Sequence, residues 1–477
     1  MNNSPIEFGT SGWRGLIADD FTFANVRLAV TAIAEHVKAG AKEPTILVGY
    51  DTRFYSEEFS QLAVDILQHH GIRTLLCETF TPTPAIAFEI MRHKLDGAIN
   101  FTASHNPASY HGLKFSSADA GPALPEVTKD IEARAARLAA SGGVPALQHG
   151  ALKSARGEKV NLRQNYLKRL EGLVRFETLR KGKLSLVVDA LHGCGAGYLD
   201  RALADHGVAV QAIRTERDCL FDGTGPDVSE ENLAPLRKAV RDSNATAGLA
   251  TDGDADRFGI VDREGTWIQP NLILALVYDY LLETRQWKMP AARSVATTEM
   301  IDAVARLHGQ KVHQTPVGFK YIGQLIREDK IALGGEESAG LTIRGHIPEK
   351  DGILACLLVA EMIAARGASI GEQVRAMCKK LGREYCPVRE NLHLSDEQMA
   401  NAVKRVAVNA STLAGRKVIS IDRTDGAKFV FEDGSWMLLR LSGTEPLLRL
   451  YVEAESAAAS AKLTREASQW VLQDGTK

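Results

Sequence analysis

Three times along the chain, a short apolar segment with strand character runs directly into a polar loop. These strands and loops are Gly97–Thr102 with residues 103–107, Thr246–Thr251 with residues 252–257, and Ile331–Gly334 with residues 335–338. Segments with helical spacing separate the short apolar runs, and this alternation is typical of parallel α/β layers. Because ligands bind beyond the carboxyl ends of the strands in such sheets, we expect the chemistry of the protein in these three loops.

The C-terminal part of the chain follows a different pattern. One helix is predicted over Ser395–Leu413, and four segments then alternate like antiparallel strands around Asp-Gly turns: Lys417–Ile421, Ala427–Phe431, Ser435–Leu441 and Leu448–Glu453. A chain of 477 residues has room for three or four domains of about 150 residues each. We therefore predict three similar α/β domains with mixed sheets and a C-terminal α+β domain around one central cleft, with the bounds 1–140, 160–262, 263–380 and 385–477.

Charge and composition exclude several classes of protein. The formal net charge of −2 lacks the positive excess that nucleic-acid binding needs. The richest apolar runs, Asn271–Leu282 and Ile353–Ala365, are too short to span a bilayer and contain acidic residues. Six cysteines without a C-x-x-C pair, and a start without the features of a secretory signal, indicate a cytoplasmic protein with reduced thiols.

The densest chemical signal is the segment Asp252-Gly253-Asp254-Ala255-Asp256-Arg257. Three carboxylates at alternate positions repel one another unless a cation lies between them. Magnesium accepts such oxygen ligands and keeps coordination sites for phosphate or water. An EF-hand is excluded because Arg257 and Arg263 stand where that loop needs glycine and glutamate. The loop therefore predicts a Mg²⁺ site made by Asp252, Asp254 and Asp256.

A serine follows the first of the three strands, in Thr102-Ala103-Ser104-His105-Asn106-Pro107. At the carboxyl end of a strand, Ser104 is well placed to be a nucleophile or a phosphate carrier. The motif is not a G-x-S-x-G elbow, so acyl transfer is disfavoured. A turn with a helix cap is the structural alternative, and a histidine such as His105, taken by itself, is more often structural than catalytic.

Two further loops carry groups that suit a phosphorylated sugar. Glu336, in the glycine-flanked loop 334–340, can accept hydrogen bonds from vicinal hydroxyls. Arg440 and Arg449 flank a turn with two hydroxyl side chains and a glycine, which is a suitable phosphate cradle. Arg14, among glycines and hydroxyls in residues 9–15, is a further candidate. Together the loops predict a site for a sugar phosphate.

At these residues the chain resembles the α-D-phosphohexomutase family, which comprises phosphoglucomutases, phosphomannomutases and phosphoglucosamine mutases. The motifs T-A-S-H-N-P, D-G-D-A-D-R and G-E-E-S occur in the family's order, and the match extends from Gly9 to Arg449. The resemblance implies four domains, three α/β and one α+β. It also implies an enzyme that interconverts hexose 1-phosphate and hexose 6-phosphate through a phosphoserine and a hexose 1,6-bisphosphate, with Mg²⁺ as cofactor.

The resemblance further implies a role for each matching residue. Ser104 would carry the phosphoryl group and would complete the metal site of the three aspartates. Lys114 would transfer protons, with Arg14 and His105 beside it in the catalytic centre. Substrate would be bound by Arg257, Lys320, Glu336, Ser338, Arg440, Ser442, Gly443, Thr444 and Arg449.

The chain departs from the family at Gly340, where G-E-M-S members have a histidine that is a second acid–base candidate. We consider Lys320 and His346 as replacements for it. The G-E-E-S version is more similar to glucose-handling members, so we expect glucose phosphates, with mannose or glucosamine specificity as alternatives. The sequence leaves open whether the protein is a monomer or a dimer.

Two functions outside the mutases stay open at this point. One is a Mg²⁺-dependent sugar phosphatase, because D-G-D-A-D is similar to the D-x-D of aspartyl-phosphate enzymes. The other is a non-catalytic sugar-phosphate sensor. A phosphatase would release phosphate, and a sensor would bind without turnover.

Overall fold

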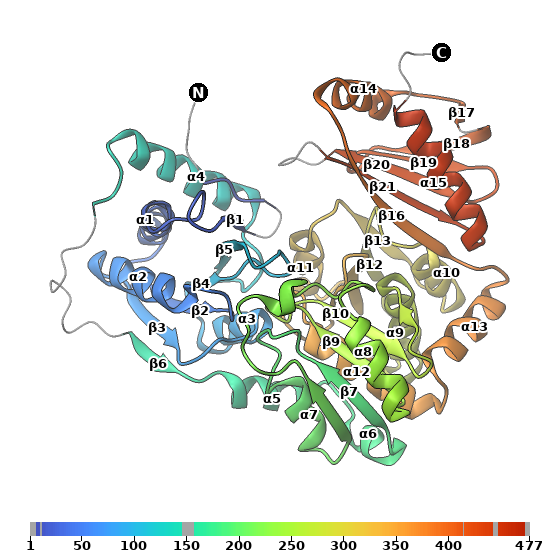
Figure 1. Cartoon of the computed structure of the whole chain (residues 1–477), viewed down its shortest axis with the longest axis horizontal. Coiled ribbons are helices and arrows are strands. Elements are labelled where there is room, and N and C mark those ends of the chain that lie inside the picture. Colours follow the sequence, from blue (N-terminus) through green and yellow to red (C-terminus); the bar gives the residue numbers. More distant parts are fainter. Residues whose placement is uncertain (1–5, 10–11, 146–156, 414, 442–446, 473–477) are drawn as a thin grey trace.

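The computed structural model describes the chain except for residues 1–5, 10–11, 146–156, 414, 442–446 and 473–477. The described residues form four sheets, and each sheet belongs to a separate stretch of the sequence. Figure 1 shows the first unit on one side of the molecule, the second and third units beside each other, and the fourth unit above the third.

The first unit is a mixed six-stranded sheet in the order β1-β5-β4-β2-β3-β6. Strands β4, β2, β3 and β6 are parallel, β5 is antiparallel to β4, and the edge strand β1 is antiparallel to β5. Helix α1 packs against α2 and α4, and α3 packs against α5, the helix that leads from this sheet into the second unit. The elements are β1 (Trp13–Leu16), α1 (Phe23–Gly40), β2 (Thr45–Tyr50), α2 (Ser56–His69), β3 (Arg73–Cys77), α3 (Thr83–His93), β4 (Gly97–Phe101), β5 (Tyr110–Ser117), α4 (Pro125–Ala140), β6 (Glu158–Val160) and α5 (Arg163–Glu171).

The second unit is a five-stranded sheet in the order β11-β10-β9-β7-β8. Strands β8, β7 and β9 are parallel, and β10 returns antiparallel to β9. Its elements are α6 (Phe176–Gly182), β7 (Ser185–Asp189), α7 (Leu199–Ala204), β8 (Ala209–Ile213), the 3₁₀ turn η1 (Phe221–Gly223), α8 (Ala234–Ser243), β9 (Ala247–Thr251), β10 (Phe258–Asp262) and β11 (Trp267–Ile268).

The third unit repeats this plan with four strands in the order β13-β12-β14-β15, of which β15 is antiparallel. Two predominantly apolar helices, α9 and α12, are almost wholly buried, as expected for helices that are covered on more than one side. The elements are α9 (Pro270–Arg285), β12 (Ala291–Ser294), α10 (Met300–Leu307), β13 (Val312–Thr315), α11 (Phe319–Arg327), β14 (Leu333–Glu336), β15 (Gly340–Ile343), α12 (Gly352–Arg366) and α13 (Ile370–Leu381).

Each of the three polar loops predicted from the sequence joins a parallel strand to an antiparallel return strand. The pairs are β4 and β5, β9 and β10, and β14 and β15. The mixed sheets of the prediction are thereby confirmed, and the return strands explain them.

The fourth unit is an antiparallel sheet in the order β16-β21-β20-β19-β18-β17, covered by two helices. The predicted helix over Ser395–Leu413 is too long: α14 ends at Ala407, and the last two residues of that range form strand β17. The elements are β16 (Cys386–His393), α14 (Asp396–Ala407), β17 (Thr412–Leu413), β18 (Arg416–Asp422), β19 (Ala427–Phe431), β20 (Trp436–Leu441), β21 (Leu447–Ala454) and α15 (Ala457–Leu472).

The hydrophobic core is divided between the units. One continuous cluster runs through the first three units, whereas the fourth has a cluster of its own between its sheet and its helices. A small third-to-fourth-unit contact is made by five apolar side chains: Val295, Ala296, Trp436, Leu438 and Tyr451. The buried Lys428 ammonium adds an ion pair of 2.9 Å to Glu299 across the same contact.

Among the helices of the described residues, none is long and apolar enough by itself to cross a membrane. Helices α12 and α13 pass that test only as a pair, across a bend of 76°.

Candidate active site

Ser104 and the three aspartates meet where the first unit contacts the second. The Ser104 hydroxyl donates a hydrogen bond of 2.9 Å to Asp252 Oδ2, although the two residues are 148 positions apart. Lys114, on β5, donates to Asp254 Oδ2 at 2.6 Å and to Asp256 Oδ2 at 2.8 Å. Two strand-end loops and one return strand therefore build a single cluster.

The three aspartates are fully buried, and one carboxylate oxygen of each lies within 4.8 Å of one oxygen of the other two. Burial raises the pKa of Asp252 well above its usual value, and the charges of Asp254 and Asp256 raise it further. One oxygen of Asp254 and one of Asp256 are buried without a hydrogen-bond partner. Unsatisfied buried carboxylate oxygens fit a hard divalent cation such as Mg²⁺.

Two lysines balance the charge of this cluster. Burial alone would raise the pKa of Asp256, but Lys114, Lys350 and Arg257 together hold it well below its usual value. Lys350 lies 3.3 Å from Asp256 Oδ2 and 2.8 Å from Glu349 Oε1. Our sequence reasoning missed Lys350, because Glu349-Lys350-Asp351 has the appearance of an ordinary charged turn.

Gly340, which stands where G-E-M-S members have a histidine, makes room for Lys350. A Cβ at Gly340 would come within 2.5 Å of Lys350 Cδ. The two candidates named from the sequence lie elsewhere: His346 is fully buried in a 2.7 Å pair with Asp351, and the Lys320 ammonium lies over the Tyr321 ring. Lys350 is therefore the lysine that the structure places against the aspartates in addition to Lys114.

Arg14, His105 and Arg257 surround the serine loop. Arg14 donates to Asn106 Oδ1 at 2.5 Å, and the Arg257 backbone amide donates to Asp252 Oδ1 at 3.0 Å. His105 Nδ1 lies 3.4 Å from the Ser104 oxygen. Burial, together with the charges of Arg257 and Arg14, holds the pKa of His105 well below its usual value, so its imidazole is neutral at pH 7.

Arg53 holds the serine loop in place, and sequence reasoning did not single it out. Its fully buried guanidinium donates to the backbone carbonyls of Ser104 (2.7 Å), Asn106 (2.5 Å), Pro107 (2.8 Å) and Tyr110 (3.0 Å). It also pairs with Asp51 at 3.1 Å. Ser104 adopts a left-handed backbone conformation, with φ at 52°, and this brace offsets the cost of that conformation.

Two successive glutamates, Glu336 at the end of β14 and Glu337 directly after it, have different hydrogen-bond partners. Glu336 is buried and accepts a hydrogen bond of 2.7 Å from the Gly318 amide. Burial, aided by the neighbouring charge of Glu337, raises the pKa of Glu336 to about 7. Glu337 instead accepts hydrogen bonds from Ser294 (3.0 Å) and Thr297 (3.2 Å). Ser338 follows it and is half-buried.

Arg440 and Arg449 face each other as register partners on β20 and β21. Arg440 Nε donates to Asp425 Oδ2 at 2.8 Å, and the same oxygen accepts the Val317 amide at 3.1 Å. Asp425 therefore connects the arginines of the fourth unit to the third. The other predicted anchor residues, Ser442, Gly443 and Thr444, lie outside the described residues.

Three mixed α/β units with a serine hydroxyl against a buried aspartate triad, followed by a unit that carries paired arginines, define the architecture of a phosphohexomutase. Sequence models of all four domains of the phosphoglucomutase/phosphomannomutase family match the chain. Domain I matches residues 5–141, domain II residues 164–265, domain III residues 269–381 and the C-terminal domain residues 389–468. The chain belongs to this family, which confirms the resemblance, and it is an enzyme of the mutase type, an isomerase.

Similar proteins carry names that differ in the sugar. The phosphoglucomutase/phosphomannomutase of Thermococcus kodakarensis is 30% identical over 454 residues, which cover 94% of each chain. A protein of Methanopyrus kandleri named "Probable phosphoglucosamine mutase" is 30% identical over 464 residues, which cover 96% of each chain. A crystal structure from Thermus thermophilus, provisionally described as a phosphomannomutase, has a TM-score of 0.85 at 32% identity and covers 98% of this chain and 99% of its own.

Proposed function

We propose that the protein interconverts hexose 1-phosphate and hexose 6-phosphate, with glucose phosphates preferred, through a phosphorylated Ser104 and a hexose 1,6-bisphosphate intermediate. The observation that carries this proposal is the contact between the Ser104 hydroxyl and Asp252 inside the aspartate cluster. A hydroxyl held there has the position that a phosphate carrier beside a metal needs.

In the first half of the cycle, the bond between phosphorus and the Ser104 oxygen would break and a bond to the free sugar hydroxyl would form. Lys114 would move the proton that this exchange displaces. Arg14, His105 and Arg257 would line the reacting groups. Asp252, Asp254 and Asp256 would hold Mg²⁺, which when bound would offset the negative charge of the phosphoryl oxygens.

The second half requires the bisphosphate to reorient inside the cleft, so that its other phosphate faces Ser104 and rephosphorylates it. Arg440 and Arg449 would hold whichever phosphate is not being transferred, and Glu336, Ser338 and Lys320 would contact the sugar. The separate core of the fourth unit supports this step, because a unit with its own core can shift as a body. Sugar phosphates are thus the proposed small-molecule partners, with the bisphosphate as activator.

An assay of three substrates tests the proposal. Glucose, mannose and glucosamine 1-phosphates are each supplied with Mg²⁺ and a trace of the matching bisphosphate, and the 6-phosphate is measured. We expect turnover that is fastest for glucose, ends on chelation of the metal, and leaves phosphoserine at position 104 in mass spectra. Release of inorganic phosphate with an acid-labile phosphoaspartate would instead indicate a phosphatase, and binding without turnover a sensor.

The pKa of Glu336 predicts a pH dependence of substrate binding. Since the pKa of this carboxyl is raised to about 7, the group is protonated in the native protein below that pH. Above it, the group is a carboxylate, which can only accept hydrogen bonds. We expect KM for the hexose phosphate to fall as the pH rises from about 6 to 8. In Glu336→Gln this part of the profile should be flat, while the titration of the substrate phosphate itself remains. An unchanged profile in the variant would assign the dependence to the substrate alone.

The paired arginines predict an effect on binding rather than on the chemical step. Arg440→Ala removes a charge-assisted contact worth about 1.5–3 kcal/mol, so KM should rise roughly 10- to 100-fold with kcat nearly unchanged. Asp425→Asn should raise KM less, because the amide still accepts from Arg440. Asp433→Asn, at the other Asp-Gly turn of the unit, where the carboxylate pairs with Arg416, is the matched control. A fall in kcat without a change in KM would refute the anchor role.

A further inference from the structure

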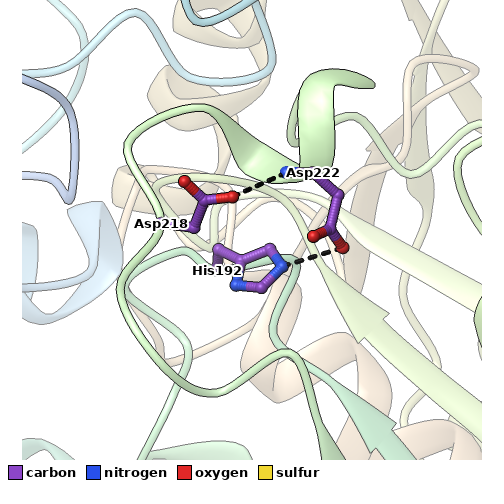
Figure 2. A group of neighbouring side chains, drawn as sticks. All are labelled: His192, Asp218 and Asp222. Atoms are coloured by element: carbon purple, nitrogen blue, oxygen red, sulfur yellow. Dashed lines mark hydrogen bonds and ion pairs between the residues drawn. The ribbon is translucent and has the colours of Figure 1, made fainter.

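A second cluster of metal-binding side chains lies in the second unit, apart from the aspartate triad. It consists of His192, which follows β7, and Asp218 and Asp222, which lie in the loop after β8, and we call it the His192 cluster (Figure 2). One ligand atom of each residue lies within 4.8 Å of the others. Asp222 also lines a surface depression of about 560 Å³, so the cluster is accessible to an ion from solvent.

The imidazole of His192 is oriented as a metal ligand would be. Its side chain is only 4% exposed, and its Nδ1 lies 2.9 Å from the Glu216 carbonyl, to which it donates. This bond leaves Nε2 facing Asp222, 3.0 Å from its Oδ2 but without hydrogen-bond geometry, while the Asp218 carboxylate beside it accepts the Leu220 and Asp222 amides at 2.9 Å each. Metal-binding histidines commonly donate their other ring nitrogen to a backbone carbonyl in this way.

The charge of the His192 cluster is also not balanced by basic residues. In the described part of the chain, no lysine or arginine forms an ion pair with Asp218 or Asp222. A cluster of similar composition, Asp279, Glu283 and His308, is different: Arg366 lies 2.6 Å from Asp279 Oδ2 and 2.7 Å from Glu283 Oε2. The cluster around Asp279 is a salt-bridge network with an arginine, whereas among the described residues only the imidazole of His192 pairs with a carboxylate of the His192 cluster.

We propose that the His192 cluster binds Zn²⁺ through His192 Nε2 and one oxygen from each of Asp218 and Asp222. A nitrogen ligand combined with carboxylates suits zinc, whereas magnesium prefers oxygen ligands alone. Three protein ligands leave a fourth position for water at the surface depression.

Bound zinc would stabilise the contact between the first two units. The loop that carries Asp218 and Asp222 also carries Arg217, which donates to the carbonyls of Thr52 (2.9 Å) and Arg53 (3.0 Å). Arg53 in turn braces the Ser104 loop. A zinc ion that fixes this loop at its base therefore strengthens a support of the active site without touching the aspartate triad.

Equilibrium dialysis of the full chain against Zn²⁺ in excess Mg²⁺ tests the site, because Mg²⁺ competes for the oxygen-only triad. We expect one zinc per chain in the wild-type protein and at least about a tenfold loss of affinity in His192→Gln and in Asp222→Asn. His206→Gln is the matched control: His206 Nδ1 also donates to a backbone carbonyl, at 2.8 Å, but its nearest carboxylate, of Glu171, is 3.7 Å away. Zinc binding should be unchanged in this control.

Two further measurements keep the result unambiguous. Zn²⁺ should shift the ¹⁵N resonance of His192 Nε2 and raise the Tm of the wild-type protein, and the rise in Tm should be absent in a folded His192→Gln variant. Both should persist in Ser104→Ala, so the outcome is independent of the proposed catalytic cycle. Zinc that stays bound in His192→Gln, or none bound in the wild-type protein, would overturn the proposal and leave a simple histidine–aspartate ion pair.

Discussion

Ser104→Ala is expected to lower kcat at least about 10³-fold, to the limit of detection, even with saturating Mg²⁺ and bisphosphate. The hydroxyl oxygen is the only atom removed, and it is the atom that contacts Asp252 at 2.9 Å. The carbon framework of the loop and its bonds to Arg53 are retained, because those bonds use backbone carbonyls. The loss should therefore appear without a comparable loss of stability.

Ser109→Ala is the control for this result. Ser109 is an exposed serine in the same loop, and its described hydrogen bond uses the backbone carbonyl. Steady-state kinetics should give the control a kcat near that of the wild-type enzyme. Turnover at the wild-type rate in Ser104→Ala would assign the phosphate carrier to another residue.

Arg53→Met is expected to lower the free energy of unfolding by about 3–5 kcal/mol. The substitution leaves the buried Asp51 carboxylate without its positively charged partner and four backbone carbonyls without their guanidinium donor. Turnover should fall as well, since the left-handed conformation of Ser104 then loses its support. Arg53→Lys should rescue little, because one ammonium group cannot reproduce the fork of a guanidinium.

Urea denaturation compares this variant with Arg73→Met, which breaks an exposed ion pair with Glu158 in the same unit. The control should change the free energy of unfolding by less than about 1 kcal/mol. Equal effects of the two substitutions would contradict the bracing role of Arg53.

The parts of the fold that could be predicted are those with a strong local pattern. Gly97–Phe101 and Ala247–Thr251 are wholly buried strands, and their apolar runs locate them and the loops that follow. The return strand Tyr110–Ser117 was not predicted, because its pairing with β4 and β1 lets it carry His111 and Lys114 in place of an apolar run. Its identity depends on tertiary pairing, which periodicity does not contain.

The same distinction applies to the site. Ser104 and the aspartates follow strands in compact motifs, so their positions signal chemistry. Arg53 and Lys350 have no such signal, since their partners lie far away in the sequence: the carbonyls that Arg53 binds are more than 50 positions distant, and Lys350 meets Asp256 from another unit. Only the folded chain brings these charges together.

The backbone conformation at Ser104 limits which residues can serve as its substitutes. Its φ of 52° lies in the left-handed region, where a side chain branched at Cβ is strained. Threonine offers the same hydroxyl but would meet this steric barrier, whereas glycine or asparagine would accept the backbone and lack the nucleophile. Serine is thus the smallest hydroxyl-bearing choice at this corner, and the geometry of the peptide chain, as much as the chemistry, selects it.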